Sequence, residues 1–383
     1  MYKSKYQRTS RPARRGQRID PKRFIKAAIP VQESIYVPQN KFSDFNLNEL
    51  LKQNLESNGF ITPTPVQDKS ISITLEGKDL IAVANTGTGK TMAFLLPLLN
   101  TIIDNRSKKA LIVAPTRELA LQIENECRKL AKGSGLMGVL LIGGVPIGPQ
   151  LRDLRQKPEI IIGTPGRIKD HIERGSLKLD EIGVVVLDEV DRMLDMGFIH
   201  DVRSILSTVP VERQSLFFSA TISPTIERLI KDFTESPVSI MAKTAETSTN
   251  VDQTVQYYVS SGEKMDRLHD ILINAEVEKT LIFSETRRSV ERLSTELTNR
   301  GFQADAMHGD KSQGQRQAAL RKFRDSHVKI LVATDVAARG IDVDGITHVI
   351  NYDLPQTYDD YTHRIGRAGR AGNKGYAITF VSR

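Results

Sequence analysis

The hydrophobic positions of the chain fall into short apolar runs that alternate with longer amphipathic segments. Each apolar run has the length of one strand, and the segments between them are long enough for helices. Because strands that alternate with helices form parallel sheets covered by helices, this pattern predicts an α/β fold. The expected strands occupy residues 79–84, 110–115, 138–143, 159–164, 184–189 and 215–220, and then 280–285, 304–309, 329–334, 348–353 and 376–381.

A polar segment separates the two series of strands. Residues 241–250, MAKTAETSTN, are small and polar and have no hydrophobic periodicity, which is typical of a linker. The sequence therefore predicts two tandem α/β domains, each with a parallel sheet flanked by helices. The predicted boundaries are a basic extension over residues 1–41, a first domain over 42–243, a linker over 244–251 and a second domain over 252–383.

The two halves resemble each other at a fixed offset. KALIVAPTR at 109–117 and KTLIFSETR at 279–287 share Lys, Leu, Ile, Thr and Arg and lie 170 residues apart. At the same offset, 159–164 and 329–334 share an Ile and a final Thr. Two matches in one register favour tandem copies of one unit. The shared Thr and Arg follow expected strands, so they would lie at the edge where open parallel sheets bind ligands.

The composition is that of a soluble globular protein, with 39% hydrophobic and 26% charged residues. The single cysteine, Cys127, excludes an internal disulfide and favours the reducing cytoplasm. No apolar run has the length needed to cross a bilayer. We therefore expect a cytoplasmic, monomeric protein with no membrane segment.

Positive charge is concentrated at the N-terminus. Residues 1–26 hold ten lysines and arginines and one aspartate, a net charge of +9, whereas the whole chain carries +8. Because it has few aliphatic residues, we expect this extension to be largely disordered. We favour a role in binding the phosphate backbone of nucleic acid without regard to sequence, with Tyr2 and Tyr6 able to stack on bases. A solvated end that aids solubility and an Arg-rich transit peptide are the alternatives.

ANTGTGKT, residues 84–91, lies between an expected strand and an expected helix, which is the context of a phosphate-binding loop. Backbone N–H groups and the helix N-terminus would surround the phosphates. Lys90 would reach the β- and γ-phosphates of ATP, and Thr91 would bind Mg²⁺. A Gly-rich turn without a ligand is the alternative. The other loop residues expected to contact the nucleotide are Thr86, Gly87, Thr88 and Gly89.

VVVLDE, residues 184–189, ends an apolar strand with two carboxylates. Asp188 would hold Mg²⁺, and Glu189 would orient and deprotonate the attacking water. Alone, two acidic residues after a strand are weak evidence, because such residues often begin the next helix. A phosphate-binding loop earlier in the same domain favours the catalytic interpretation.

HRIGRAGRAG, residues 363–372, places arginines at every third position of the second domain. Arg364, Arg367 and Arg370 would share one face of a short helix or turn. Guanidinium groups that reach a γ-phosphate from another domain would stabilise the charge of the transition state when the domains close. The alternative is a solvated basic turn.

From Phe42 to Ser382 the order of motifs resembles that of the DEAD-box RNA helicases of superfamily 2. This resemblance implies two RecA-like domains, ATP and Mg²⁺ as cofactors, and single-stranded RNA or a short RNA duplex as partner. It further implies ATP hydrolysis coupled to local duplex separation or to remodelling of RNA–protein complexes. The motifs are GFITPTPVQ (59–67), PTRELA (115–120), Gly143–Gly144, TPGR (164–167), DEVD (188–191), SAT (219–221), LIFSETR (281–287), HGDKSQGQR (308–316), ATDVAARGID (333–342) and 363–372.

The resemblance also implies roles for single residues. Phe42 and Gln67 would contact adenine, and Asp342 would contact the ribose. Arg367 and Arg370 would be the arginine fingers. Residues implied to couple hydrolysis to RNA are Asp191, Ser219, Thr221 and His363, and those implied to contact the RNA backbone are Arg117, Gly144, Thr164, Arg167, Arg287, Gly309, Gln313, Arg316 and Thr334.

Two positions depart from the most common form of these motifs. Asn85 replaces a frequent Gln in the phosphate-binding loop, and Val190 replaces Ala in DEVD. Val190 adds two methyl groups and removes no functional group, and in a tight site such overpacking costs about 1–3 kcal/mol. Two other functions are also compatible with the motifs. One is an ATP-dependent RNA clamp or assembly platform that unwinds little, and the other is a DNA translocase of the same superfamily.

Overall fold

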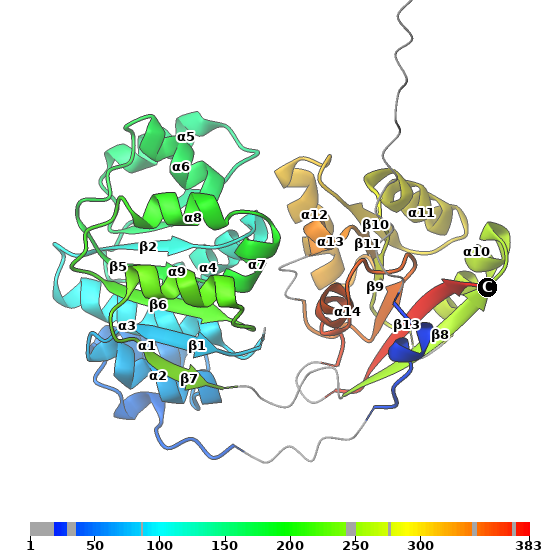
Figure 1. Ribbon diagram of the computed structural model, residues 1–383, viewed down its shortest axis with the longest axis horizontal. Coiled ribbons are helices and arrows are strands. Elements are labelled where there is room, and N and C mark those ends of the chain that lie inside the picture. The colour runs from blue at the N-terminus through cyan, green and yellow to red at the C-terminus, as the bar shows by residue number, and fades with distance from the viewer. Residues whose placement is uncertain are drawn as a thin grey trace, which may run out of the picture.

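The computed structural model describes residues 19–28, 36–85, 87–242, 250–274, 277–338, 343–369 and 373–383. Three residues singled out above, Thr86, Asp342 and Arg370, lie outside this part of the chain. Residues 1–18 of the basic extension and most of the predicted linker also lie outside it. Figure 1 shows two α/β bodies side by side, each built from one sheet and the helices that cover it.

The first sheet contains seven parallel strands in the order β3-β4-β2-β5-β6-β1-β7. Along the central strand β5, successive side chains point to opposite faces: Val184 and Val186 pack into one apolar core, and Val185 and Leu187 into the other. Because helices cover both faces, this strand is apolar throughout. The strands are β1 (Leu80–Val83), β2 (Lys109–Val113), β3 (Gly138–Leu141), β4 (Ile160–Gly163), β5 (Ile182–Leu187), β6 (Gln214–Ser219) and β7 (Val238–Met241).

Six helices of this domain, α3, α4, α5, α6, α7 and α9, each directly follow a strand, so their N-termini lie close to the carboxyl ends of the strands. α3 directly follows the phosphate-binding loop, and α2 packs along it. The helical segments are η2 (Phe42–Asp44), α1 (Glu49–Ser57), α2 (Pro65–Leu75), α3 (Lys90–Asp104), α4 (Arg117–Leu130), α5 (Ile147–Arg155), α6 (Pro165–Glu173), α7 (Val190–Asp195), α8 (Ile199–Leu206) and α9 (Pro224–Phe233).

The second sheet has six parallel strands in the order β10-β11-β9-β12-β13-β8. Leu281 and Phe283 of its central strand β9 face one core, and Ile282 between them faces the other. The strands are β8 (Val251–Tyr258), β9 (Thr280–Phe283), β10 (Ala304–Met307), β11 (Ile330–Ala333), β12 (His348–Asn351) and β13 (Gly375–Ser382). The helices are α10 (Ser261–Leu272), α11 (Arg287–Asn299), α12 (Gln313–Arg324), α13 (Asp335–Ala338) and α14 (Tyr358–Ile365).

The prediction of an α/β fold with two parallel sheets is confirmed, and every expected strand is present. Two strands were missed, β7 and β8, and each forms an edge of its sheet. Edge strands are covered on fewer sides, so they carry polar and exposed residues and lack a continuous apolar run.

Two parts of the basic extension, residues 19–28 and 36–41, make contacts with the two domains that the sequence did not predict. Residues 19–28 lie on the second domain beside β8 (Figure 1), where the short helix η1 (Pro21–Phe24) buries the side chain of Phe24 completely. On the first domain, the Asp68 carboxylate accepts hydrogen bonds from the Tyr36 hydroxyl at 2.6 Å and the Gln39 N–H at 2.8 Å. The sequence did not predict the docking of Phe24, because its apolar partners lie far away in the sequence.

Candidate active site

The phosphate-binding loop joins β1 to α3 as its sequence predicts. Gly87 and Gly89 have positive φ angles of 78° and 89°, which glycine adopts without steric cost. α3 begins at Lys90, whose side chain is buried and donates from Nζ to the Ala84 carbonyl at 3.2 Å. The Thr88 hydroxyl donates to the Asn85 carbonyl at 2.7 Å. The described residues of the loop thus include two glycines in conformations that favour glycine, directly before the N-terminus of α3.

Gln67 connects the expected adenine site to this loop. Its Oε1 accepts the Thr64 N–H at 2.9 Å, which caps α2, and its Nε2 donates to the Gly89 carbonyl at 3.0 Å. A Cβ atom on Gly89 would lie 2.4 Å from Nε2 of Gln67, so a side chain there would displace the Gln67 amide, and the φ of 89° also favours glycine. Phe42, the expected stacking partner of adenine, is buried next to Phe45 in the core of the first domain.

Asp188 and Glu189 follow β5 and lie buried at its carboxyl end. The Glu189 N–H donates to Asp188 Oδ1 at 2.9 Å, and Glu189 has a φ of 52°. A left-handed conformation is unusual for a residue other than glycine, and such strain is concentrated at functional sites. Asp191 lies one turn further along the chain, in the first turn of α7.

The two adjacent carboxyl groups have opposite pKa shifts. Burial raises the pKa of Asp188 above its ordinary value, although the Lys90 charge opposes this. Burial would also raise the pKa of Glu189, but the positive charges of Arg192, Lys90 and Arg367 outweigh it and lower that pKa. Glu189 is therefore ionised at neutral pH, which is the state that a general base requires.

Arg192 is a residue of the site that sequence reasoning missed. It lies in α7 and forms a buried ion pair from Nη1 to Glu189 Oε2 at 2.5 Å. Its Nε and Nη2 atoms have no hydrogen-bond partner among the described residues. The available signal was its spacing of three residues after Glu189, which places both side chains on one side of a helical turn.

Asp191 ties α7 to the segment that follows β6. Its Oδ2 accepts the N–H groups of Ala220 and Thr221 at 3.0 and 2.8 Å and the Thr221 hydroxyl at 3.0 Å. The Ser219 hydroxyl in turn accepts the Asp191 N–H at 3.2 Å and donates to the Thr221 carbonyl. A movement at the carboxyl end of β5 would therefore also move residues 219–221.

The second domain completes the site. A cavity between the domains is lined by Lys90 and Glu189 on one side and by His363 and Arg367 on the other. Arg364 lies next to them, and its buried guanidinium pairs with both carboxylate oxygens of Asp335 at 2.6 and 2.7 Å. A small pocket is lined by Arg364 together with His363 and Arg367. Because Arg370 lies outside the described residues, the common face of the three arginines stays a prediction.

The residues expected to contact RNA line the outer side of the same interdomain boundary. In the first domain, the Arg117 guanidinium lies so close to Gly144, whose φ is 75°, that a Cβ atom there would be 2.0 Å from its Nη1. One groove is lined by Arg117, Thr164, Arg167, Gly309 and Arg316, from both domains.

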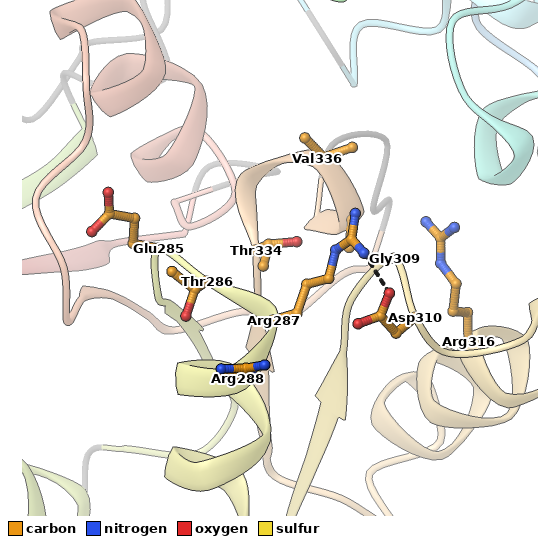
Figure 2. A pocket seen from close by; sticks show the side chains of 10 residues that line it. Glu285, Thr286, Arg287, Arg288, Gly309, Asp310, Arg316, Thr334 and Val336 are labelled. Atoms are coloured by element: carbon orange, nitrogen blue, oxygen red, sulfur yellow. Dashed lines mark hydrogen bonds and ion pairs between the residues drawn. The ribbon is translucent and has the colours of Figure 1, made fainter. Parts of the chain in front are cut away.

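A second pocket, on the second domain, is lined by Arg287, Gly309, Arg316 and Thr334 (Figure 2). Arg287 forms an ion pair with Asp310, drawn as a dashed line in Figure 2. The Thr and Arg residues shared by the two halves of the sequence therefore lie at the carboxyl edge of each sheet: Arg117 and Thr164 in the first domain, and Arg287 and Thr334 in the second.

Two residues that were expected to contact RNA, Arg316 and Gln313, instead contact Glu118 of the other domain. Arg316 Nη2 lies 3.1 Å from Glu118 Oε1, and Gln313 Nε2 donates to the same oxygen at 3.2 Å. All three side chains are buried. Glu118 belongs to the first domain and was not among the expected site residues, although it directly follows Arg117 in the sequence.

Two searches over the described residues found nothing further. No helix in that part of the chain is both long and apolar enough to cross a membrane. No group of three or more His, Cys, Asp or Glu side chains there has an arrangement that could hold a metal ion by itself.

A phosphate-binding loop, an ionised buried carboxylate and an arginine from a second parallel α/β domain define a nucleotide hydrolase whose site is split between domains. Comparisons with known proteins agree with this class. Residues 64–229 match the DEAD/DEAH box helicase family model, and residues 263–372 match the helicase conserved C-terminal domain. The chain belongs to the DEAD/DEAH box helicase family and, within it, to the DEAD-box RNA helicases.

The ATP-dependent RNA helicase CshA of Listeria monocytogenes is 48% identical over 343 residues, which cover 89% of this chain and 66% of CshA. The chain thus spans about two thirds of the length of this relative. The crystal structure of a DEAD box protein from the hyperthermophile Methanococcus jannaschii is 40% identical with a TM-score of 0.52, over 90% of this chain and 93% of that one. S. cerevisiae Dbp5 bound to RNA and ADP BeF3 is 28% identical with a TM-score of 0.78, over 89% of each chain.

The side chain of Val190 lies away from the chemistry. It is 1% exposed and belongs to the apolar core that contains Met193 and Phe217. We predict that Val190→Ala lowers the free energy of unfolding by about 2 kcal/mol, because two buried methyl groups are lost and a cavity remains. ATP turnover should stay within about twofold of the wild type. Thermal unfolding and an ATPase assay check both parts, and a large loss of turnover would show that Val190 shapes the site.

Arg192 and Glu189 form a buried pair, so the loss of one partner should cost more than the loss of both. We predict that Arg192→Gln destabilises the protein by about 3–5 kcal/mol, because the Glu189 carboxylate is left buried without its nearest positive partner. Adding Glu189→Gln should recover part of this loss. Unfolding of the wild type, both single variants and the double variant measures the coupling, and strictly additive losses would contradict the pairing.

Proposed function

We propose that this protein is an ATP-dependent RNA helicase that uses ATP hydrolysis to separate short RNA duplexes or remodel RNA–protein complexes. The observation that carries the proposal is the single cavity that brings Lys90 and Glu189 of the first domain together with Arg367 of the second. Each domain alone holds only part of this set, so hydrolysis would require the two domains to be closed. We also propose a cytoplasmic location, in keeping with the one cysteine, Cys127.

In the proposed reaction each residue of the cavity has a separate role. The backbone of the loop up to Gly89 and the Lys90 ammonium would bind the β- and γ-phosphates. The ionised Glu189 would take a proton from the attacking water, and Arg367 would neutralise the charge that develops on the γ-phosphate. Arg370 and Asp342, which lie outside the described residues, keep their proposed roles as second arginine finger and ribose contact.

The donor set at the end of β5 fits Mg²⁺, and the proposed ligands are Thr91 and Asp188. Mg²⁺ usually takes one or two protein oxygens and completes its shell with water and phosphate oxygens. Burial raises the pKa of the Asp188 carboxyl group, and a nearby cation would reverse that shift. When bound, the ion would neutralise phosphate charge and hold the phosphates in place.

Nucleotide choice is proposed to depend on Gln67 and Phe42. Gln67 already contacts the phosphate-binding loop through Gly89, so an adenine that binds Gln67 would also influence that loop. Thr86, Gly87 and Thr88 remain proposed contacts of the nucleotide.

The proposed coupling runs from the hydrolysis site to the RNA groove through α7. Asp191, Ser219 and Thr221 form one hydrogen-bonded unit next to Glu189, and His363 lines the same cavity from the other domain. Loss of the γ-phosphate would remove the negative charge that both domains bind, and the cleft would then open. RNA held by backbone contacts on both domains would be released or bent by that movement. The proposed contacts are Arg117, Gly144, Thr164, Arg167, Arg287, Gly309, Gln313, Arg316 and Thr334.

The arrangement of the domains supports the proposal. The chain is closer in sequence to the Methanococcus jannaschii protein, yet closer in overall shape to Dbp5 bound to RNA and ADP BeF3. Because both alignments cover about nine tenths of this chain, we attribute the difference in TM-score to the relative placement of the domains. The described arrangement is therefore similar to that of a relative which holds RNA and a nucleotide analogue.

ATPase activity with and without single-stranded RNA tests the proposal directly. We predict stimulation by RNA in the wild type and, for Glu189→Gln, a turnover lower by about 100-fold or more with ATP binding retained, because the general base is lost while the amide keeps the size of the side chain and an oxygen that can accept a hydrogen bond from Arg192. Single-stranded DNA in place of RNA tests the DNA translocase, and a strand-displacement assay separates a helicase from a clamp. Equal turnover in both proteins would remove Glu189 from the mechanism.

The basic extension offers a second test. Deleting residues 1–18 removes seven lysines and arginines and leaves the docked residues 19–28 in place. We predict weaker RNA binding with a smaller dependence on salt, because fewer counterions are released, and an unchanged ATPase rate without RNA. A full-length chain with these seven residues changed to Gln is the matched control. Unchanged RNA affinity at low salt would favour a role in solubility alone.

A further inference from the structure

Residues 19–28, here called the N-terminal strap, form an integral part of the second domain. Asp20 Oδ1 accepts the Lys22 N–H at 3.0 Å and so begins η1. Lys26 pairs with Gln253 of the edge strand β8 in both directions, at 3.1 and 2.8 Å. The Ala28 N–H donates to Asp252 Oδ1 at 2.6 Å. The strap therefore covers the outer edge of β8 at the point where the strand begins.

The aromatic contacts of the strap are all made with α14. The ring of Phe24 is completely buried, and its centroid lies 4.7 Å from that of Tyr361. The guanidinium of Arg23 lies 4.2 Å from the centroid of the Tyr358 ring, within cation–π range. The Tyr361 hydroxyl donates to Gln253 Oε1 at 3.0 Å, so the same tyrosine also binds the strand that the strap covers.

α14 is the helix that leads to Arg367. Its last turn carries His363, which lines the interdomain cavity together with Arg367. Arg364, in the same turn, pairs with Asp335. The helix is thus held both by the ion pair with Asp335 and by the aromatic contacts with the strap.

The segment after α14 also rests on the start of β8. Gly369 has a φ of 68°, and a Cβ atom there would lie 3.0 Å from Val251 Cγ2 and 3.3 Å from the Asn250 carbonyl. Val251 and Phe24 are buried in the same apolar cluster. A change at Phe24 would therefore reach the residues around Arg367 by two short routes, through Tyr361 and through Val251.

We propose that the N-terminal strap positions the arginine finger Arg367. Phe24 and Arg23 act as positioning residues: they touch neither ATP nor RNA, and they act through Tyr361 and Tyr358 on the orientation of α14. This inference rests on the proposed ATPase, in which Arg367 stabilises the transition state. It assigns a role in turnover to a segment that precedes the first domain in the sequence.

The test compares Phe24→Ala with Phe24→Leu in the full chain, at saturating RNA and varied ATP. We expect Phe24→Ala to lower kcat about tenfold, since a displacement of about 1 Å at a transition-state contact can cost about 100-fold. The KM for ATP should change little, because most of the proposed adenine and phosphate contacts belong to the first domain and Arg367 acts on the charge that develops in the transition state. Phe24→Leu should recover most of the loss, because it refills the apolar site.

Two further variants separate positioning from general loss of structure. Ile25→Ala changes the neighbouring, largely exposed side chain of the same strap and should leave kcat unaltered. Arg23→Ala removes an exposed side chain that lies over the Tyr358 ring. It should lower kcat about twofold to threefold with an unaltered melting temperature. This variant tests the inference even if Phe24→Ala does not fold.

The outcomes distinguish this inference from the proposed function. If the wild type hydrolyses ATP and Glu189→Gln does not, but Phe24→Ala or, failing its folding, Arg23→Ala matches the wild type, the strap has no role in positioning. A fall in kcat that comes with an equal rise in KM would also overturn the inference, because it indicates general damage. Equal turnover of the wild type and Glu189→Gln would overturn the proposed function itself.

Discussion

Glu189 carries a carboxylate that is buried between the two domains, and its charge is balanced by Lys90, Arg192 and Arg367. A buried charge that loses its partners costs several kcal/mol, so the arrangement around Glu189 favours the closed state. Two of the three partners belong to the first domain, whereas Arg367 comes from the second. The phosphates of ATP would bring further negative charge to Lys90 and Arg367, and the balance at Glu189 would then depend on the nucleotide.

The internal repeat gives the two domains the same local structure at the ends of corresponding strands. Thr116 and Thr286 each begin a helix by accepting an N–H three residues on, and the arginine that follows each of them packs beside a glycine of the next loop. In the first domain Arg117 lies on Gly144, and in the second Arg287 lies on Gly309. The matching strand ends thus present the same chemistry on both sides of the groove, which suits a polymer with a repeating backbone.

Prediction from the sequence is most successful for strands that are buried on both faces of the sheet. Central strands such as β5 and β9 are apolar throughout because both faces are covered, and the glycines and Lys90 of the phosphate-binding loop follow from the needs of an anion. The edge strands β7 and β8 could not be found in this way, because they are half exposed. Arg192 was missed because its spacing of three residues after Glu189 is common to many exposed pairs, and only the structure shows that this pair is buried. The docking of Phe24 was missed because its partners Tyr361 and Val251 lie hundreds of residues away.

The position of the N-terminal strap also constrains the order of events during protein synthesis. Phe24 leaves the ribosome long before its partner Tyr361, and the first domain lies between them in the sequence. At usual translation speeds of about 5–20 residues per second, the strap waits on the order of tens of seconds for its binding site. The first domain can therefore fold before the binding site of the strap exists, and the strap can dock only after α14 has been made.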